Sequence, residues 1–121
     1  MKHYIVLLDR AAMPGEMRIP GFDHVWVEHP HTQAGECVDH LWRATIGVTH
    51  ESSVTGPDID GCPKLALLVV TGEDLSVVDQ AACRQRGIRL IHLPRADRPP
   101  QVWAEALMDA IEDFARPSRD H

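Results

Sequence analysis

The stretch P-K-L-A-L-L-V-V-T-G-E-D-L-S-V-V-D-Q-A-A-C-R-Q-R-G-I-R-L-I-H-L, residues 63–93, decides the fold class. Its run Leu65–Val70 is apolar throughout, which is typical of a parallel strand covered by helices on both faces. A helical segment follows from about residue 74, and Gly87 stands just past its end, where a left-handed residue is expected. A second strand-like run occupies residues 88–93. This strand–helix–strand order predicts an α/β domain with a parallel sheet.

Three further strand-like runs precede this stretch, and less regular or helical segments separate them. The first and fourth runs are apolar throughout, whereas the second alternates and the fifth is interrupted by Arg89 and His92, which is typical of less buried edge strands. We therefore predict a single flavodoxin-like doubly wound domain, with a five-stranded parallel sheet of order 2-1-3-4-5 and helices on both faces. The predicted strands are 4–8, 24–28, 46–49, 65–70 and 88–93. The predicted helices are 32–44 with a Thr32 cap, a short helix from Pro57, a helix from Asp74 or Ser76 to Arg86, and 101–115.

The last helix, about 100–116, has one apolar and one polar face. The apolar face is predicted to contain Val102, Trp103, Ala106, Leu107, Ala110, Ile111 and Phe114. The polar face contains Glu105, Asp109, Glu112 and Asp113. Since a helix with one solvent-exposed face suits a domain that ends there, we expect residues 1–121 to form one self-contained domain.

Composition excludes several classes of partner. The chain has 121 residues and a formal net charge of -6, which argues against nucleic acid and against an anionic membrane surface. The longest apolar run is far shorter than the roughly 20 residues that span a bilayer, and no signal-peptide pattern is present. Cys37, Cys62 and Cys83 form no C-x-x-C pair, so we expect reduced thiols in a cytoplasmic protein, with Cys37 and Cys83 in the core.

Three segments resemble one enzyme family. Residues 79–88, D-Q-A-A-C-R-Q-R-G-I, are similar to that family's D-L-A-A-C-R-E-R-G-I, and residues 44–55, A-T-I-G-V-T-H-E-S-S-V-T, to its A-D-I-V-I-T-N-K-V-P-L-T. The opening I-V-L-L-D-R-A-A-M-P-G, residues 5–15, resembles its first strand followed by L-D-R and a proline. The family is that of the D-isomer-specific 2-hydroxyacid dehydrogenases, in the glycerate dehydrogenase (hydroxypyruvate reductase) branch. The resemblance covers the substrate-binding domain of these enzymes.

The chain lacks the parts of that family that carry the chemistry. No G-x-G-x-x-G turn, which would hold the pyrophosphate of a dinucleotide, occurs in the 121 residues. The family's catalytic Arg, Glu and His all lie beyond the region of resemblance. We therefore predict no catalytic residue and no cofactor, with NAD entering only if a separate cofactor-domain partner exists.

Polar residues follow the predicted first, third and fourth strands, whose carboxyl ends meet at the edge where open α/β sheets bind ligands. Glu51 stands where the family often has Lys. The loop beginning Thr71-Gly72-Glu73 is one or two residues longer than the family's T-G-T-D-N-I-D, whose backbone amides usually hold the substrate carboxylate. Because the family's substrates are anions, Glu51 and Glu73 are expected to disfavour them. The candidate ligand-binding residues are Asp9, Glu51, Ser52, Ser53, Thr71, Gly72 and Glu73, and a surface loop without a ligand is the alternative.

Other kinds of site find little support in the sequence. Glu28-His29-Pro30-His31 is the densest histidine cluster, but no zinc-ligand spacing occurs, so no metal is predicted. Ser52-Ser53 has no identifiable base, and neighbouring Asp39 and His40 point in different directions on a helix, which argues against nucleophilic catalysis. The segment after the first strand lacks a flavodoxin phosphate loop. The receiver-domain pattern of an Asp after strand three and a Lys after strand five is also absent.

The sequence thus predicts a stand-alone dehydrogenase substrate domain that is non-catalytic and acts as a small-molecule-binding or protein-interaction module. Its partner would be a small-molecule anion or a protein, and neither nucleic acid nor a membrane. The alternative is the substrate-binding half of a split NAD-dependent 2-hydroxyacid oxidoreductase, completed by a separate cofactor-domain chain. A homodimer formed through Trp26, Trp42 or Trp103 is a third possibility.

Overall fold

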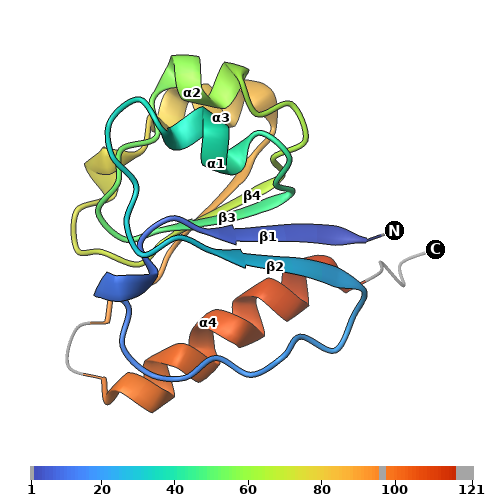
Figure 1. Ribbon diagram of the computed structural model, residues 1–121, viewed down its shortest axis with the longest axis vertical. Helices are drawn as coiled ribbons and strands as arrows, with labels where there is room; N and C mark the ends of the chain where they lie inside the picture. Colours follow the sequence, from blue (N-terminus) through green and yellow to red (C-terminus); the bar gives the residue numbers. More distant parts are fainter. Residues whose placement is uncertain (1, 96–97, 117–121) are drawn as a thin grey trace.

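The computed structural model describes residues 2–95 and 98–116, and within these ranges it contains one five-stranded sheet (Figure 1). All strand pairs are parallel and the order is β2-β1-β3-β4-β5, so the predicted topology is confirmed. The strands are β1 (His3–Leu7), β2 (His24–Glu28), β3 (Ile46–Thr49), β4 (Leu67–Val70) and β5 (Arg89–His92). The helices are α1 (Cys37–Leu41), α2 (Gly56–Asp60), α3 (Gln80–Arg86) and α4 (Pro100–Ala115), with short 3-10 turns at Arg10–Ala12 and Leu75–Val77.

The connections divide between the two faces of the sheet, as right-handed crossovers require. The chain moves one way from β1 to β2 and the opposite way from β2 through β5, and a reversal of direction changes the face on which a connection lies. Figure 1 shows α1, α2 and α3 on one face and α4 on the other, beside the long β1–β2 connection. The two predicted layers of helix are therefore confirmed.

Alternating side chains of the central strands fill a separate core on each face. Val6 and Leu8 pack under α1, α2 and α3, whereas Ile5 and Leu7 pack against α4. Trp103 of α4 is fully buried in the second core, and its indole Nε1 donates to the Leu93 carbonyl at 2.9 Å. The prediction that Trp103 could form a self-association surface is therefore wrong.

The first helix is much shorter than the predicted 32–44. Thr32 does not cap it, because the Thr32 hydroxyl donates instead to the Leu8 carbonyl at 2.8 Å. Gly35 then takes a left-handed φ of 90°, which no helix interior contains. Residues 31–35 consequently form a loop that covers the carboxyl end of β1, and this loop contributes to the site described below.

The predicted helix from Asp74 or Ser76 to Arg86 is divided in two. Asp74 caps the short turn Leu75–Val77, and Asp79 separately caps α3 by accepting from the Ala82 amide at 3.0 Å. Between them Val78 is extended, because it bridges to Val54 of the β3–α2 loop. Gly87 adopts a φ of 71° just past α3, which confirms its predicted role.

The buried face of α4 is rotated relative to the prediction. Ala104 and Met108 are fully buried, whereas Val102 is 55% exposed and Ala110 only partly buried. The difference arises because α4 is covered from two directions, by the sheet and by the β1–β2 connection that contributes Met13 and Met17 to the same core.

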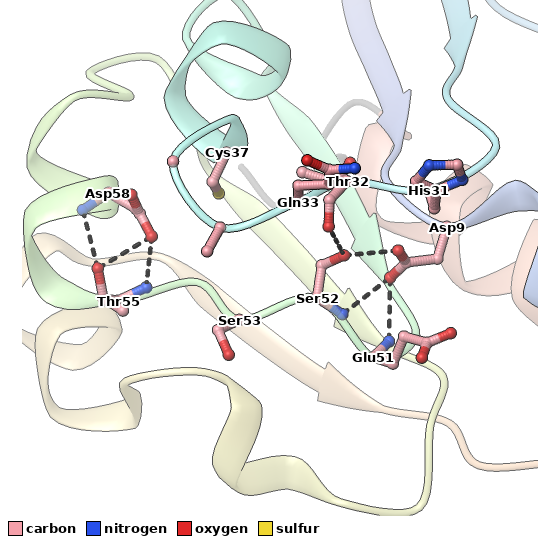
Figure 2. Close-up of a pocket in the computed structure, with 12 residues that line it drawn as sticks. Asp9, His31, Thr32, Gln33, Cys37, Glu51, Ser52, Ser53, Thr55 and Asp58 are labelled. Atoms are coloured by element: carbon pink, nitrogen blue, oxygen red, sulfur yellow. Dashed lines mark hydrogen bonds between the residues drawn. The ribbon is translucent and has the colours of Figure 1, made fainter.

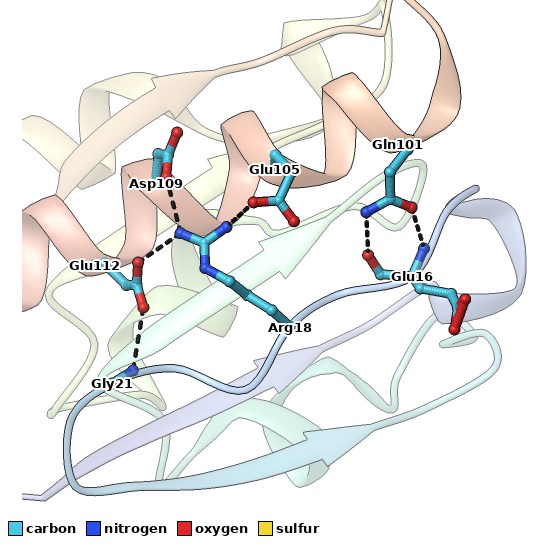
Figure 3. A network of polar contacts seen from close by, with 7 residues as sticks. All are labelled: Glu16, Arg18, Gly21, Gln101, Glu105, Asp109 and Glu112. Carbon is cyan, nitrogen blue, oxygen red and sulfur yellow. Dashed lines mark hydrogen bonds and ion pairs between the residues drawn. The ribbon is translucent and has the colours of Figure 1, made fainter.

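Part of the predicted polar face of α4 also contacts this connection (Figure 3). Arg18 donates to Glu105, to Asp109 at 2.8 Å and to Glu112 at 2.6 Å, and Glu112 accepts the Gly21 amide at 3.1 Å. The expectation of a helix face left to solvent is therefore wrong for Glu112, whose side chain is 25% exposed, whereas Asp109 stays 75% exposed although it is paired.

No helix in residues 2–95 and 98–116 has the length and apolar character needed to cross a bilayer.

Candidate functional site

Asp9 lies just past the end of β1 and is almost fully buried, with 1% of its surface exposed. Its Oδ2 accepts the amides of His50, Glu51 and Ser52 at 3.0, 3.0 and 2.9 Å, and its Oδ1 accepts the Ser52 hydroxyl at 2.5 Å (Figure 2). The Thr49 hydroxyl lies 3.2 Å from Oδ2, but its single proton has a closer acceptor in the Ser52 carbonyl at 2.7 Å. Asp9 therefore joins the end of β1 to the loop that follows β3.

These contacts keep Asp9 ionised. Burial alone would raise its pKa, but the hydrogen bonds from the Ser52 hydroxyl and from the amides of Glu51, Ser52 and His50 outweigh it and lower the pKa below the ordinary aspartate value. A carboxylate that accepts this many hydrogen bonds has little capacity left for a ligand or for a proton.

A pocket of about 530 Å³ opens beside Asp9 (Figure 2). It lies between the 31–35 loop, the first residue of α1 and the loop from β3 to α2. Its lining residues are Asp9, His31, Thr32, Gln33, Ala34, Gly35, Cys37, Glu51, Ser52, Ser53, Thr55 and Asp58. The pocket therefore contains three carboxylates and, among its lining residues, no Lys or Arg.

Two of the lining residues are committed to capping α2. The Thr55 amide and hydroxyl donate to Asp58 Oδ2 at 3.0 and 2.9 Å, and the Asp58 amide points back to Thr55 Oγ1 at 3.3 Å. This reciprocal arrangement is a capping box. Glu51 and Ser53 on this side of the pocket, and His31 and Gln33 on the other, are exposed, so these lining side chains are best placed to meet a ligand.

Cys37 lines the pocket as a neutral thiol, which is a poor nucleophile. Burial, and then the neighbouring Asp58, raise the pKa of Cys37 to about 12, so the reactive thiolate is strongly disfavoured. Cys62 and Cys83 are buried as free thiols as well, and burial raises the pKa of Cys62 to about 11. The prediction that Cys37 and Cys83 belong to the core is confirmed.

A second, shallower hollow of about 440 Å³ lies on the other side of Glu51, between the loops that follow β3 and β4. Its lining residues are His50, Glu51, Gly72, Glu73, Asp74 and Val77. Gly72 makes this arrangement possible, because a Cβ at that position would lie 2.1 Å from the His50 carbonyl oxygen. The glycine therefore allows the two loops to approach closely.

Thr71 and the adjacent histidines support this hollow from behind. Thr71 is buried, and its hydroxyl lies 3.1 Å from His50 Nδ1. His92 of β5 bonds the Gly72 carbonyl at 2.7 Å, and because a carbonyl only accepts, His92 Nε2 carries the proton. Thr71 thus holds the loop and does not line either hollow.

The seven predicted ligand-binding residues meet at one edge of the sheet but do not form one cavity. Asp9, Ser52 and Ser53 line the larger pocket, Gly72 and Glu73 line the shallower hollow, Glu51 lines both, and Thr71 lines neither. Sequence reasoning missed Thr32, Gln33, Cys37, Thr55 and Asp58 as lining residues. Only the T-x-x-D spacing of the last two carried a local signal, that of a capping box.

One histidine of the dense cluster, His29, packs against a histidine of α1. The rings of His29 and His40 stack at 3.6 Å with an interplanar angle of 4°. Within the ranges that the structure describes, no group of three or more His, Cys, Asp or Glu side chains could hold a metal ion.

Comparison with known proteins gives the family context. No family model matches the chain. A protein of Haemophilus influenzae named as a 2-hydroxyacid dehydrogenase is 33% identical over 86 residues, which are 69% of this chain and 27% of that protein. A glycerate dehydrogenase of Methylorubrum extorquens is 28% identical over 94 residues, 77% of this chain and 30% of that enzyme. The chain is related to the 2-hydroxyacid dehydrogenases.

Solved structures agree at the level of the fold. The NAD⁺-bound 3-phosphoglycerate dehydrogenase of Entamoeba histolytica matches with a TM-score of 0.58 and 15% identity over 78% of this chain and 33% of that one. The NAD-dependent formate dehydrogenase of Staphylococcus aureus matches with a TM-score of 0.53 and 16% identity over 77% of this chain and 31% of that one. This chain therefore spans about a third or less of each of these four dehydrogenases.

Proposed function

We propose that these 121 residues form a ligand-binding module of the dehydrogenase substrate-domain type that has no catalytic group of its own. The observation that carries this proposal is the hydrogen bonding of Asp9. It is the one charged side chain among the buried residues of the described ranges, and at least four donors already occupy it. A general base must reach a substrate proton and hold it near the working pH, whereas Asp9 is buried, already accepts these donors and has a lowered pKa.

The other chemically capable groups at this edge support the same proposal. Cys37 has a raised pKa and so remains a thiol. His50 is bound to Thr71 through Nδ1. The Ser52 hydroxyl donates to Asp9, but the lowered pKa of Asp9 makes it a weak base for activating a serine nucleophile, and Ser52 itself is buried. His50 and Ser52 therefore join loops of the site, and Cys37 stays in its unreactive thiol form.

The negative charge of the shallower hollow affects which ligands it can bind. Glu51, Glu73 and Asp74 all line it, and hydrogen bonds from the Ser76 hydroxyl and amide lower the pKa of Asp74, which stays ionised. A carboxylate about 4 Å from an anion costs about 1 kcal/mol in water and about 4 kcal/mol at an effective dielectric constant of 20. We therefore propose that the module prefers an uncharged or cationic small molecule over the 2-hydroxy acid anion.

Calorimetric titration with D-glycerate and with hydroxypyruvate tests this proposal. We expect no submillimolar affinity for the wild-type chain, and several-fold tighter binding when both Glu51→Gln and Glu73→Gln are introduced, because the repulsion is then reduced. Glu16→Gln is the matched control, since Glu16 is an exposed carboxylate of the β1–β2 connection that lines neither hollow. Submillimolar binding of either acid to the wild type would overturn the proposal.

A second candidate function follows from the partial coverage of the relatives, of which this chain matches 27% and 30%. In this alternative the module supplies the substrate side of a 2-hydroxyacid oxidoreductase, and a nicotinamide-binding domain supplies the rest. NADH oxidation with hydroxypyruvate distinguishes the two. The ligand-binding proposal expects none from these 121 residues, with or without a G-x-G-x-x-G domain, whereas activity restored by such a domain supports the alternative.

A further inference from the structure

One edge strand of the sheet has hydrogen-bonding groups without a partner in the described ranges. In the β1–β2 ladder, the His3 amide donates to the Asp23 carbonyl at 3.1 Å and the His29 amide donates to the Leu7 carbonyl at 2.9 Å. Alternate residues of a parallel strand bond to the same neighbour, so the odd-numbered residues 23–29 face β1. The amides and carbonyls of His24, Trp26 and Glu28 therefore point away from the sheet.

This edge has few of the features that protect edge strands from pairing. The segment 24–28 contains no Pro and no Lys, and it pairs with β1 in continuous register without a bulge. At the opposite edge, β5 exposes Arg89 and His92, which oppose the approach of another strand. The two edges of the same sheet thus differ in how open they are to a further strand.

Apolar surface flanks the β2 edge on both faces. Ile19 is 82% exposed and lines a hollow of about 240 Å³ with Met17, Pro20 and Trp26, on the α4 face. Trp42 is 51% exposed and lines a hollow of about 240 Å³ together with Tyr4 and Val27, on the opposite face. Ile19 and Trp42 are two of the three exposed large hydrophobic residues in the described ranges, and exposed apolar surface around an open edge is typical of an interaction site.

We propose that β2 pairs antiparallel with β2 of a second copy of this chain, about a two-fold axis through Trp26. In this register His24 lies opposite Glu28 of the second copy, Val25 opposite its Val27, and Trp26 opposite its Trp26. The outward groups of all three outward-facing residues are then paired, which gives about six backbone hydrogen bonds. The two sheets become one continuous sheet, and the interface is the same patch on both copies, as a closed dimer requires.

The side chains of β2 favour a second copy in this register. Glu28 is the one acidic residue of β2, and it is held in place by Trp26 Nε1 at 2.8 Å and by Arg10 at 3.5 Å. Pairing about Trp26 places it opposite an imidazole, and full overlap of the five residues occurs only in this register. Pairing about Glu28 itself would place two carboxylates opposite one another, which is unfavourable in a cross-strand pair. The strand is therefore complementary to itself.

Sedimentation equilibrium with a charge-reversal series tests the dimer. We expect the wild type to sediment at twice the 13.5 kDa of one chain at submillimolar concentration. His24→Glu places two carboxylates in each cross-strand pair and should weaken association at least about fivefold. The double variant His24→Glu with Glu28→Lys places opposite charges in each cross-strand pair and should recover association, whereas Glu36→Lys, a charge reversal at a partly exposed residue outside β2, should change it little.

Hydrogen exchange provides a second readout that does not depend on the variants. The Trp26 amide points outward, so it should exchange slowly in the dimer and rapidly when the chain is diluted to monomer. A wild type that stays monomeric at submillimolar concentration overturns the inference and leaves the edge to another occupant. A dimer with an unprotected Trp26 amide, or one that His24→Glu leaves unchanged, also overturns it.

Discussion

Two polar networks of the molecule are opposites in charge and in burial. At Asp9 a single buried carboxylate accepts hydrogen bonds from three amides and a hydroxyl (Figure 2). At Arg18 a single guanidinium, on the β1–β2 connection, donates to three carboxylates of α4 whose side chains are 25% to 75% exposed (Figure 3). Both networks join segments that are distant in sequence. Water can take the place of a lost hydrogen-bond partner only in the network around Arg18.

This difference in burial predicts which of the two networks stabilises the fold more. Removing a buried acceptor leaves its donors without partners, and each unmade bond costs the desolvation of a polar group. Around Arg18 the solvent screens each ion pair, and exposed ion pairs contribute little. Asp9 and Arg18 have similar numbers of hydrogen-bond partners. The difference in burial therefore decides which of the two side chains costs more stability when it is removed.

The largest effect is expected for Asp9→Ala. This change leaves the amides of His50, Glu51 and Ser52 without an acceptor, and we expect it to lower the free energy of unfolding by roughly 3 kcal/mol or more. Urea denaturation of the variant against the wild type measures it. Ser53→Ala is the matched control, because Ser53 is an exposed residue of the same loop, and a loss at Asp9 no larger than at Ser53 would contradict the comparison.

A smaller effect is expected from pH through the same carboxylate. Because the pKa of Asp9 is lowered in the folded protein, its contribution to stability is complete above the ordinary aspartate pKa of about 4. The contribution is lost as the pH falls from there through the lowered pKa. Thermal unfolding of the wild type and of Asp9→Asn between neutral pH and pH 3 should therefore show the two melting temperatures converging in acid. A constant difference across this range would show that folding does not lower the pKa of Asp9.

The smallest effect is expected for Arg18→Met, which removes the cation while keeping most of the apolar stem. We expect a decrease in melting temperature smaller than that of Asp9→Ala, and one that shrinks further in concentrated salt, where surface pairs are screened. Faster hydrogen exchange at Gly21 should accompany it, since Gly21 donates to Glu112 beside Arg18. Arg116→Met, which removes a single exposed pair with Asp113, is the control. A larger loss at Arg18 than at Asp9 would reverse the comparison.

The fold was predictable because its signals are local and periodic. The strands 24–28 and 46–49 were predicted with the observed bounds, and Gly87 marked the end of α3 through its backbone conformation. The length of the first helix was not predictable, because Thr32 carries a capping side chain that bonds the Leu8 carbonyl, 24 residues earlier in the chain. A side chain that can cap a helix and can also satisfy a distant carbonyl gives the same local signal in both cases.

The position of the candidate site could be predicted from the sequence, but the roles of its individual residues could not. The order of strands placed Asp9, Ser52 and Gly72 at one edge of the sheet, since the carboxyl ends of parallel strands meet there. Sequence alone did not separate Asp9, which holds the loops together, from Glu51, which faces the solvent at the rim of both hollows. The two carboxylates are chemically alike, and only their surroundings differ.

The sequence by itself determined the order of elements and the faces that they bury, because the alternation of apolar side chains along a strand and around a helix is a property of neighbouring residues. The tertiary structure alone decided which polar groups are free to meet a ligand or a second copy. That depends on donors and acceptors some 40 residues apart, such as Asp9 and Ser52, which meet only when the strands pair. It also depends on which side of β2 remains without a neighbouring strand.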